Sequence, residues 1–245
     1  MHKQPTELEV ERLKKVYRGY EKSRRAAECW SPTNLGNQFI VRERQAVAKR
    51  LFEKHDFFPL ADRMILDVGC GGGGELARLL EWGANPGNLY GVDLLPERIE
   101  AARARNPNIR FQVANAESLS FPDGAFDIVL LFTVLSSILD ENMASRVANE
   151  AARVLRLGGA VLLYDFRYRN PYNPNTRPIT KTDMLRYFPG FKAETKRVTL
   201  MPPAARRLGL LTPYLYPALG WMPFLRTHYI ALLISPDSPD RSQFC

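Results

Sequence analysis

Cysteine is scarce in this chain and occurs in no recognisable pattern. The 245 residues include three cysteines, Cys29, Cys70 and Cys245. An odd number argues against a framework of disulfide bonds, and no two of the cysteines have the spacing of a metal site. We therefore predict neither structural disulfide bonds nor a metal at the functional site.

The sequence also contains little that reads as a targeting or membrane-spanning segment. Its start, MHKQPTELEVERLKKVY, is charged and lacks the apolar stretch of a secretory signal. Residues 208–225, LGLLTPYLYPALGWMPFL, have no charge across eighteen positions. Pro213, Pro217 and Pro223 argue against one continuous spanning helix there. We expect a cytoplasmic protein.

What the chain does contain is an ordinary globular composition with an excess of positive charge. Charged residues make up 24 % and apolar residues 45 % of the chain, the balance of a folded domain. The length suits one α/β domain with extensions. The net charge of +8 favours a polyanion or an anionic membrane as partner, and it equally fits a basic surface that contacts only solvent.

Short apolar segments alternate with helical segments along most of the chain. Residues 7–28 read as a surface helix, and a second helical pattern begins near Gln38. The expected strands are RMILDVG, NLYGVDL, IRFQVAN, a part of FDIVLLFTVLSSI, LGGAVLLYDF, FKAETKRVTL and RTHYIALLI. Helical segments separate the first five of them. Alternation at this spacing predicts βαβ units and a parallel sheet.

A glycine-rich stretch follows the first expected strand. Residues 66–76, LDVGCGGGGEL, fit the dinucleotide fingerprint Gly69-x-Gly71-x-x-Gly74. Asp67 precedes the glycines by two positions. The stretch alone does not separate a nicotinamide enzyme from other enzymes with nucleotide cofactors.

Four segments carry a more specific resemblance. In order along the chain they are ILDVGCGGGG, YGVDLLPERIEAAR, FQVANAESLSFPDGAFDIVL and RVLRLGGAVLLYDF. In this order and at these distances they resemble the class I S-adenosylmethionine-dependent methyltransferases, in particular the broad small-molecule group called type 11. The resemblance is close over residues 60–168 and rests on the strand pattern alone over residues 185–235.

The resemblance implies a fold and a domain organisation. The fold is α/β, a Rossmann-like sheet of seven mostly parallel strands with helices on both faces. Its last strand is antiparallel and lies between the fifth and the sixth. We expect residues 1–58 to form an N-terminal helical extension or lid, and residues 59–245 to form the methyltransferase domain. A hydrophobic insert, residues 201–226, separates the last two strands.

The resemblance also implies S-adenosylmethionine as the cofactor, a methionine joined to adenosine through a positively charged sulfonium. Gly69 and Gly71 let the backbone approach the methionine half closely. Asp67 helps to compensate the positive charge. Asp93 ends the second strand, where a carboxylate accepts hydrogen bonds from both ribose hydroxyls, and Leu94 follows it.

The adenine is expected near the ends of the third and fourth strands. Asn115, Ala116 and Glu117 follow the third strand, where the family reads the adenine through one side chain and a backbone N–H. Many relatives carry aspartate at the position of Asn115, and asparagine keeps an acceptor while adding a donor. Phe132 and Thr133 end the fourth strand, where the family packs the outer face of the cofactor.

The acceptor side is expected at the same edge. With an antiparallel last strand, Asp165 and His228 come from neighbouring strands, and we predict one of them, or both as a pair, as general base. Arg167 is predicted to orient an acidic or polyhydroxyl acceptor. Arg42 and Glu43, in the region where relatives place a lid helix, are weaker candidates.

The predicted function is methyl transfer to a hydroxyl of a small molecule or a lipid-linked glycan, a reaction in which positioning supplies much of the catalysis. Residues 208–225 place aromatic side chains beside arginines, as segments at a membrane interface do. We predict a hydrophobic lid that makes peripheral membrane contact or grips a lipid-linked acceptor. The alternative is a lid packed on the protein's own core or on a second subunit.

Three other functions stay open. The charge is compatible with an RNA or protein methyltransferase. However, the chain has no appended RNA module, and after the fourth strand it lacks the Asn/Asp-Pro-Pro-aromatic motif of amino-group-methylating relatives. We therefore expect no nucleic-acid partner. A nicotinamide oxidoreductase would need an acid at the hydride pocket, such as a Tyr-x-x-x-Lys pair, which the sequence does not supply. The third function that stays open is that of a non-catalytic module that still binds the cofactor.

Overall fold

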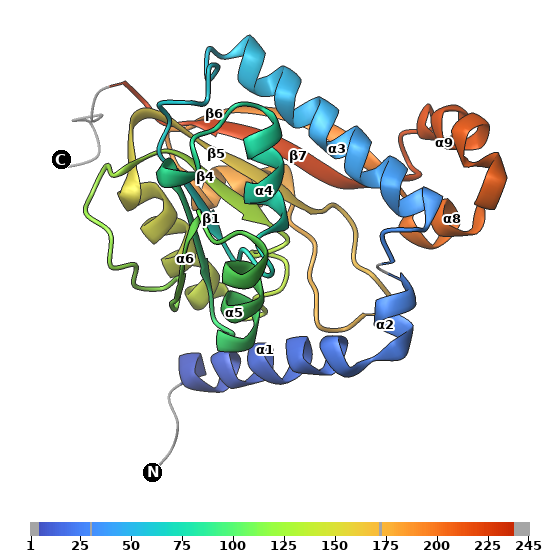
Figure 1. The fold of residues 1–245 in the computed structure, drawn as a ribbon, viewed down its shortest axis with the longest axis horizontal. Helices are drawn as coiled ribbons and strands as arrows, with labels where there is room; N and C mark the ends of the chain where they lie inside the picture. The colour runs from blue at the N-terminus through green and yellow to red at the C-terminus, as the bar shows by residue number, and fades with distance from the viewer. Residues whose placement is uncertain (1–4, 30, 172, 238–245) are drawn as a thin grey trace.

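The computed structural model describes residues 5–29, 31–171 and 173–237 around a central sheet (Figure 1). The strands are β1 (Ile65–Val68), β2 (Leu89–Asp93), β3 (Arg110–Val113), β4 (Phe126–Phe132), β5 (Leu155–Phe166), β6 (Lys192–Leu200) and β7 (Arg226–Ile234). The seven strands lie side by side in the order β3-β2-β1-β4-β5-β7-β6.

The strand directions follow the expected pattern. β1 pairs in parallel with β2 and β4, β2 with β3, and β4 with β5. β7 is antiparallel to both of its neighbours, β5 and β6. The predicted Rossmann-like sheet with an antiparallel last strand is thus confirmed. Because the parallel strands point the same way, their carboxyl ends form one edge, and ligands bind at that edge in such sheets.

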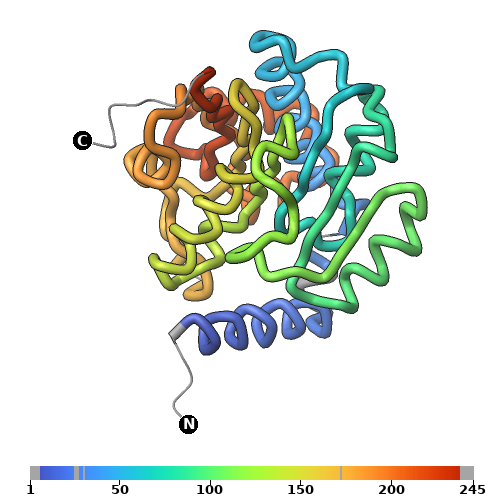
Figure 2. The backbone as a smooth tube through the Cα atoms, turned by 90° about the vertical axis from the view of Figure 1, so that its left-hand side faces the viewer, coloured from blue at the N-terminus to red at the C-terminus, as the bar shows by residue number. Residues whose placement is uncertain are grey.

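Helices cover both faces of the sheet. They are α1 (Pro5–Lys22), α2 (Arg24–Cys29), α3 (Leu35–Lys54), α4 (Gly74–Glu81), α5 (Pro96–Arg105), α6 (Glu141–Val154), α7 (Lys181–Tyr187), α8 (Pro202–Arg207) and α9 (Thr212–Gly220). Buried residues of α3, α4 and α5 pack on one face with Ile65 and Leu162. Buried residues of α6 and α7 pack on the other face with Leu66 and Leu163. Figure 2 shows α1, in dark blue, crossing one end of the molecule apart from these layers.

The N-terminal region is more divided than the sequence pattern predicts. The single surface helix expected over residues 7–28 is interrupted at Ser23, between α1 and α2. α3 begins at Leu35, slightly before the expected start near Gln38. The side chain of Asn34 accepts a hydrogen bond of 3.2 Å from the N–H of Asn37 and so caps the helix.

α7 is a short helix that was not predicted from the sequence. The hydroxyl of Thr180 accepts a hydrogen bond of 3.1 Å from the N–H of Asp183, and the carboxylate of Asp183 accepts one of 2.9 Å from the N–H of Thr180. This reciprocal pair is a capping box. The spacing Thr-x-x-Asp is therefore a signal for α7 in the sequence.

The insert folds into short helical pieces. α8, a 3₁₀ turn η2 (Gly209–Leu211) and α9 follow one another. Pro213 lies in the first turn of α9, where proline is tolerated, and Pro217 lies inside the helix. Within residues 5–29, 31–171 and 173–237, no helix combines the length and the apolar character needed to cross a membrane.

Candidate active site

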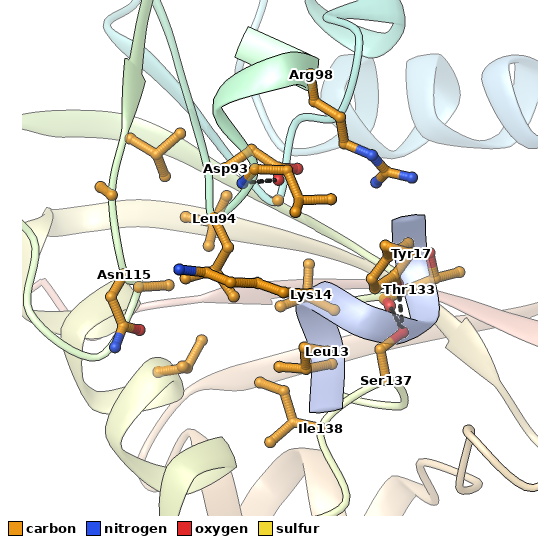
Figure 3. Close-up of a pocket in the computed structure, with 18 of the residues that line it drawn as sticks. Leu13, Lys14, Tyr17, Asp93, Leu94, Arg98, Asn115, Thr133, Ser137 and Ile138 are labelled. Carbon is orange, nitrogen blue, oxygen red and sulfur yellow. Dashed lines mark hydrogen bonds between the residues drawn. The ribbon is translucent and has the colours of Figure 1, made fainter. Parts of the chain in front are cut away.

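A pocket opens at the carboxyl edge of the parallel strands (Figure 3). It encloses about 770 Å³, including the part open to solvent, a size that suits a small molecule. The predicted cofactor residues in its lining are Gly69, Asp93, Leu94, Asn115, Ala116 and Phe132. The other three predicted residues, Asp67, Gly71 and Glu117, lie outside the lining.

The glycine-rich turn after β1 folds back on the end of β2. The N–H groups of Gly69 and Cys70 donate to the carbonyl of Val92 at 2.8 and 3.0 Å. Gly69 has a φ of +72°, which favours glycine. A Cβ at Gly69 would lie 2.9 Å from Cγ2 of Val134. Both the conformation and the space therefore require a bare backbone at this wall of the pocket.

Asp93 lies in the pocket wall at the end of β2. Its carboxylate accepts hydrogen bonds from the N–H groups of Gly71 and Leu95, both at 3.0 Å. Burial raises its pKa, while these hydrogen bonds and Arg98 act in the opposite direction. Since a carboxylate has about four lone-pair sites, acceptor sites stay available for the hydroxyls of a ribose.

Asp67 lies beneath the turn and is 2 % exposed. Its Oδ2 atom has no hydrogen-bond partner within the described residues. Burial raises its pKa well above the usual value, Glu75 and Asp93 add to the rise, and Arg44 opposes it. A buried carboxylate oxygen without a partner is costly, and a positively charged ligand above it would offset that cost. The turn, Asp67 and Asp93 thus fit S-adenosylmethionine.

Asn115 and Glu117 form a tight turn after β3. Oδ1 of Asn115 accepts a hydrogen bond of 3.1 Å from the N–H of Glu117, and Nδ2 donates to Oε2 of Glu117 at 3.0 Å. Glu117 also pairs with Arg146 of α6 at 2.7 Å. The structure therefore brings Asn115 and Ala116 to the pocket, while the carboxylate of Glu117 is engaged with α6.

α1 covers the pocket. Leu13, Lys14 and Tyr17 reach from it into the lining (Figure 3), and none of them was predicted from the sequence as a site residue. Leu13 and Tyr17 are four residues apart, which places them on one face of a helix, so this spacing is the signal that was available. Arg42 and Glu43, expected near a lid helix, lie on α3 and are not part of the lining.

Polar contacts hold α1 over the pocket. The hydroxyls of Tyr17 and Ser137 are 2.7 Å apart, and Arg12 donates to the carbonyl of Ser137 at 2.6 Å. The ion pairs with α5 are Arg18–Glu97 at 2.7 Å and Arg98–Glu21 at 2.6 Å. α1 therefore joins the helix after β2 to the turn after β4, and it bridges the two sides of the pocket.

Asp165 is fully buried at the end of β5. Its carboxylate accepts hydrogen bonds from the N–H groups of Ser136 and Phe166, both at 3.0 Å. Burial outweighs these hydrogen bonds and raises its pKa to about 7. Asp165 thus supports the turn that carries Ser137 into the pocket, but it does not itself line the pocket.

We expect the contribution of Asp165 to stability to depend on pH. Its folded-state pKa of about 7 lies above the unfolded value of about 3.9. The contribution is therefore fully present below about pH 4 and is lost as the pH rises through about 7, a change of ~4 kcal/mol. In urea unfolding, the wild type should lose stability relative to Asp165→Asn between about pH 4 and pH 8. A constant difference over this range would contradict a buried carboxyl that titrates near neutrality.

His228, on β7, packs against two aromatic rings of β5. Its ring is stacked on that of Tyr164, with centroids 4.8 Å apart and planes at 2°, and lies 4.3 Å from the ring of Phe166. Burial and two nearby arginines lower its pKa to about 3. The imidazole is therefore neutral at neutral pH and a weak proton acceptor.

Asp165 and His228 do not form a pair. His228 lies opposite Phe166 in the register of β5 and β7, so both point to the same face of the sheet. Asp165, one residue earlier, points to the other face. Accordingly, Tyr164 belongs to the core under α3 and α4, and Leu163 to the core under α6. The prediction that the two act together is wrong, because neighbouring strands bring two side chains together only when the register places them on one face.

Arg167 contacts the insert. Its guanidinium donates to the carbonyls of Pro223 and Arg226 at 2.9 and 2.7 Å. It also lies over the rings of Tyr168 and Tyr229, 4.6 and 4.9 Å from their centroids. These contacts engage the guanidinium with the protein itself, and Arg167 is not part of the pocket lining.

Comparison with known proteins identifies the central part of the chain. Residues 65–159 match the family model described as a methyltransferase domain. The match runs from β1 into β5, and it includes the glycine-rich turn, Asp93 and Asn115.

Curated relatives match over less than half of the chain. The tRNA N(3)-cytidine methyltransferase METTL2 of Gallus gallus is 33 % identical over 129 residues, 48 % of this chain and 35 % of that protein. The 2-methyl-6-phytyl-1,4-hydroquinone methyltransferase of a Synechocystis strain is 32 % identical over 126 residues, 48 % of this chain and 37 % of that protein. The 27-O-demethylrifamycin SV methyltransferase of Amycolatopsis mediterranei is 33 % identical over 108 residues, 42 % and 38 % of the two chains. The chain thus spans little more than a third of the length of these relatives.

Solved structures share the fold. The YcgJ protein of Bacillus subtilis superposes with a TM-score of 0.56 at 19 % identity, over 78 % of this chain and 100 % of that one. A SAM-dependent methyltransferase from Methanosarcina mazei superposes with a TM-score of 0.54 at 22 % identity, over 76 % and 98 % of the two chains. Residues 65–159 thus match a methyltransferase domain, and these likenesses show that the chain has the fold of the solved S-adenosylmethionine-dependent methyltransferases.

Proposed function

We propose that this chain transfers the methyl group of S-adenosylmethionine to a hydroxyl of a small molecule or a lipid-linked glycan. One observation carries the proposal. The bare backbone of Gly69 and the available acceptor sites of Asp93 meet in one pocket at the carboxyl edge of the sheet. A hydroxyl acceptor is supported by the residues after β4, Thr133-Val134-Leu135, which lack the proline-rich motif of amino-group-methylating relatives.

The residues of the chain have separate tasks in this proposal. The glycine-rich turn, Asp67 and Asp93 hold the cofactor, which supplies an activated methyl group while the acceptor hydroxyl gives up its proton. α1 covers part of the pocket through Leu13 and Tyr17 and so limits the access of water to it. Positioning the two reactants is then the main catalytic contribution of the protein.

Asp165 is the stronger of the two proposed bases. Its pKa of about 7 is close to the pH at which a general base works best, whereas the pKa of about 3 of His228 makes the imidazole a weak base. Asp165 is buried behind Ser136, so it meets an acceptor only when the turn at Ser136 opens. In the same proposal, Arg167 orders the insert beside the acceptor.

Transfer of label from methyl-labelled S-adenosylmethionine tests the proposal. The purified protein is incubated with the labelled cofactor and an extract of its source organism. The products are then divided into organic, aqueous, protein and nucleic-acid fractions. We expect label in the organic or aqueous fraction, with Asp93→Ala protein at background. Label in the organic phase identifies an apolar or lipid-linked acceptor.

The other fractions decide between the rival functions. Label in RNA would favour an RNA methyltransferase, the function to which the net charge of +8 and the likeness to a tRNA methyltransferase point. Binding to RNA would then fall steeply with salt. Label in protein would make the acceptor a polypeptide. Cofactor binding without transfer to any fraction would contradict methyl transfer and favour a binding module.

A further inference from the structure

The insert exposes large apolar side chains at one end of the molecule. Trp221 is 89 %, Leu210 88 %, Tyr214 77 % and Phe224 66 % exposed. Figure 1 shows α8 and α9, in orange-red, projecting beyond α3. Single exposed apolar residues are ordinary, but several large ones close together in a short segment mark an interaction site.

Three of the large exposed side chains lie on one side of the helical segment around α9. The buried residues of α9 recur every fourth position and are Thr212, Tyr216 and Gly220. Leu211, Tyr214 and Trp221 are exposed. Tyr214 follows Leu211 by three residues, and Trp221 follows Tyr214 by seven. At about 100° per residue these two sets lie on opposite sides of the helical segment. We call Leu211, Tyr214 and Trp221, together with the exposed Leu210 and Phe224 that flank them in the chain, the apolar face.

Close packing fixes the apolar face relative to the rest of the protein. α8 approaches α3 so closely that a Cβ at Gly36 would lie 2.2 Å from the carbonyl oxygen of Ala205. The hydroxyl of Tyr216 donates to the carboxylate of Glu43 on α3 at 2.8 Å. The face is therefore presented on a firm support, so little ordering of the chain opposes binding there.

The charged residues of the insert and of the strands beside it in the sequence have one sign over a long stretch. Between Glu194 and Asp237 the chain contains no acidic residue. The basic residues of this stretch are Lys196, Arg197, Arg206, Arg207 and Arg226. Arg207 is exposed and lies three residues before Leu210. A surface of this kind attracts anionic lipid headgroups.

We propose that the apolar face inserts into the headgroup region of an anionic bilayer, with Arg207 at the lipid phosphates. Tryptophan and tyrosine prefer this region because their rings are amphipathic. A short helical segment with one apolar side lies in the interface and does not span the bilayer. The proposal goes beyond methyl transfer and does not depend on it.

A second copy of the chain matches the apolar face less well. In a two-fold contact each face meets its own copy. The exposed Arg207 would then lie near the same residue of the copy, and residues 201–226 contain no acidic side chain. Anionic headgroups supply a negative charge for Arg207, so charge favours a bilayer over self-association.

Sedimentation with vesicles tests the proposal. The test variant is Leu210→Glu with Trp221→Glu. The matched control is Leu157→Glu with Leu185→Glu, which changes leucines of 55 % and 52 % exposure outside the insert. With vesicles of phosphatidylcholine and phosphatidylglycerol, the wild type and the control should sediment. The vesicle-bound fraction of the test variant should fall at least about tenfold. Added salt or pure phosphatidylcholine should weaken binding of the wild type.

Three results would overturn the proposal. The first is a wild type that stays in the supernatant. The second is a test variant that sediments as the wild type does. The third is a concentration-dependent dimer, seen by analytical ultracentrifugation and lost in the test variant, without vesicle binding. Binding of S-adenosylhomocysteine, measured first for all three proteins, shows that the pocket is intact. The outcome then does not depend on whether methyl transfer is demonstrated.

Discussion

Replacing Asp93 with alanine is expected to weaken binding of S-adenosylmethionine by about a hundredfold or more. The carboxylate lies in the pocket wall, and the N–H groups of Gly71 and Leu95 use only part of its acceptor capacity. Hydrogen bonds to a charged group contribute about 1.5–3 kcal/mol each, and the two ribose hydroxyls would both be lost. Isothermal titration calorimetry of the wild type and the variant measures the difference.

A modified ligand separates recognition of the ribose from support of the turn. S-adenosylhomocysteine without one ribose hydroxyl should bind the wild type about tenfold more weakly than the intact compound. Both compounds should bind the Asp93→Ala protein equally. The Asp93→Asn protein keeps one acceptor oxygen, so its affinity for S-adenosylhomocysteine should lie between those of the wild type and the Asp93→Ala protein. If the missing hydroxyl weakens binding to both proteins by the same factor, Asp93 supports the turn at Gly71 and does not contact the ribose.

Replacing Glu43 with alanine is expected to lower the free energy of unfolding by about 3 kcal/mol. Its carboxylate accepts hydrogen bonds from the N–H of Thr199 and the hydroxyl of Tyr216, both at 2.8 Å, and pairs with Arg226. Thr199 has a φ of +67°, an unusual conformation for a β-branched residue. Without Glu43, the strained backbone at Thr199 loses this partner and Arg226 loses its counter-charge.

A second glutamate on the same helix serves as the control. Glu53 faces Lys49 at 4.0 Å, and their side chains are 53 % and 48 % exposed, so Glu53→Ala should change stability by less than about 0.5 kcal/mol. Tyr216→Phe removes one hydrogen bond to Glu43 and should cost about 1 kcal/mol. Urea unfolding measures all three variants. If Glu43→Ala costs no more than Glu53→Ala, this carboxylate does not hold the insert to α3.

The sheet can be predicted from the sequence because its signals are local. The segments FKAETKRVTL and RTHYIALLI predict strands that the structure shows as Lys192–Leu200 and Arg226–Ile234. RTHYIALLI is a short, largely apolar run, and FKAETKRVTL is a mixed segment that ends in the β-branched Val198 and Thr199 and in Leu200. The turn at Gly69 is equally local, since the glycines that allow its φ values stand next to one another. Most of the predicted cofactor residues therefore meet in the pocket.

The cover over the pocket depends on contacts between distant parts of the chain. Arg18 of α1 pairs with Glu97, 79 residues away. Many arginines and glutamates are available as partners, and no local spacing distinguishes this pair. The sequence predicts helical structure over residues 7–28, but it does not say where that helix lies.

The faces of Asp165 and His228 depend on strand register. The sequence predicts that both residues lie near one edge of the sheet, and the pairing of Phe166 with His228 places them on opposite faces. A shift of one residue between β5 and β7 would reverse this outcome. Register is set by the packing of the whole sheet, so the two residues alone do not determine it.

The position of β7 between β5 and β6 affects the order in which the strands can pair during synthesis. Fifty-nine residues lie between Phe166, the end of β5, and Arg226, the start of β7. At about 5–20 residues per second, a ribosome needs about 3–12 s to make them. During that time the apolar β5 has an unpaired edge. If β6 paired with that edge first, it would occupy the place of β7. β6 ends up at the rim of the sheet, where Lys192, Glu194 and Lys196 discourage pairing with other chains. β5 has no such protection along its buried residues, so we expect the chain to be most open to aggregation until β7 has paired with β5.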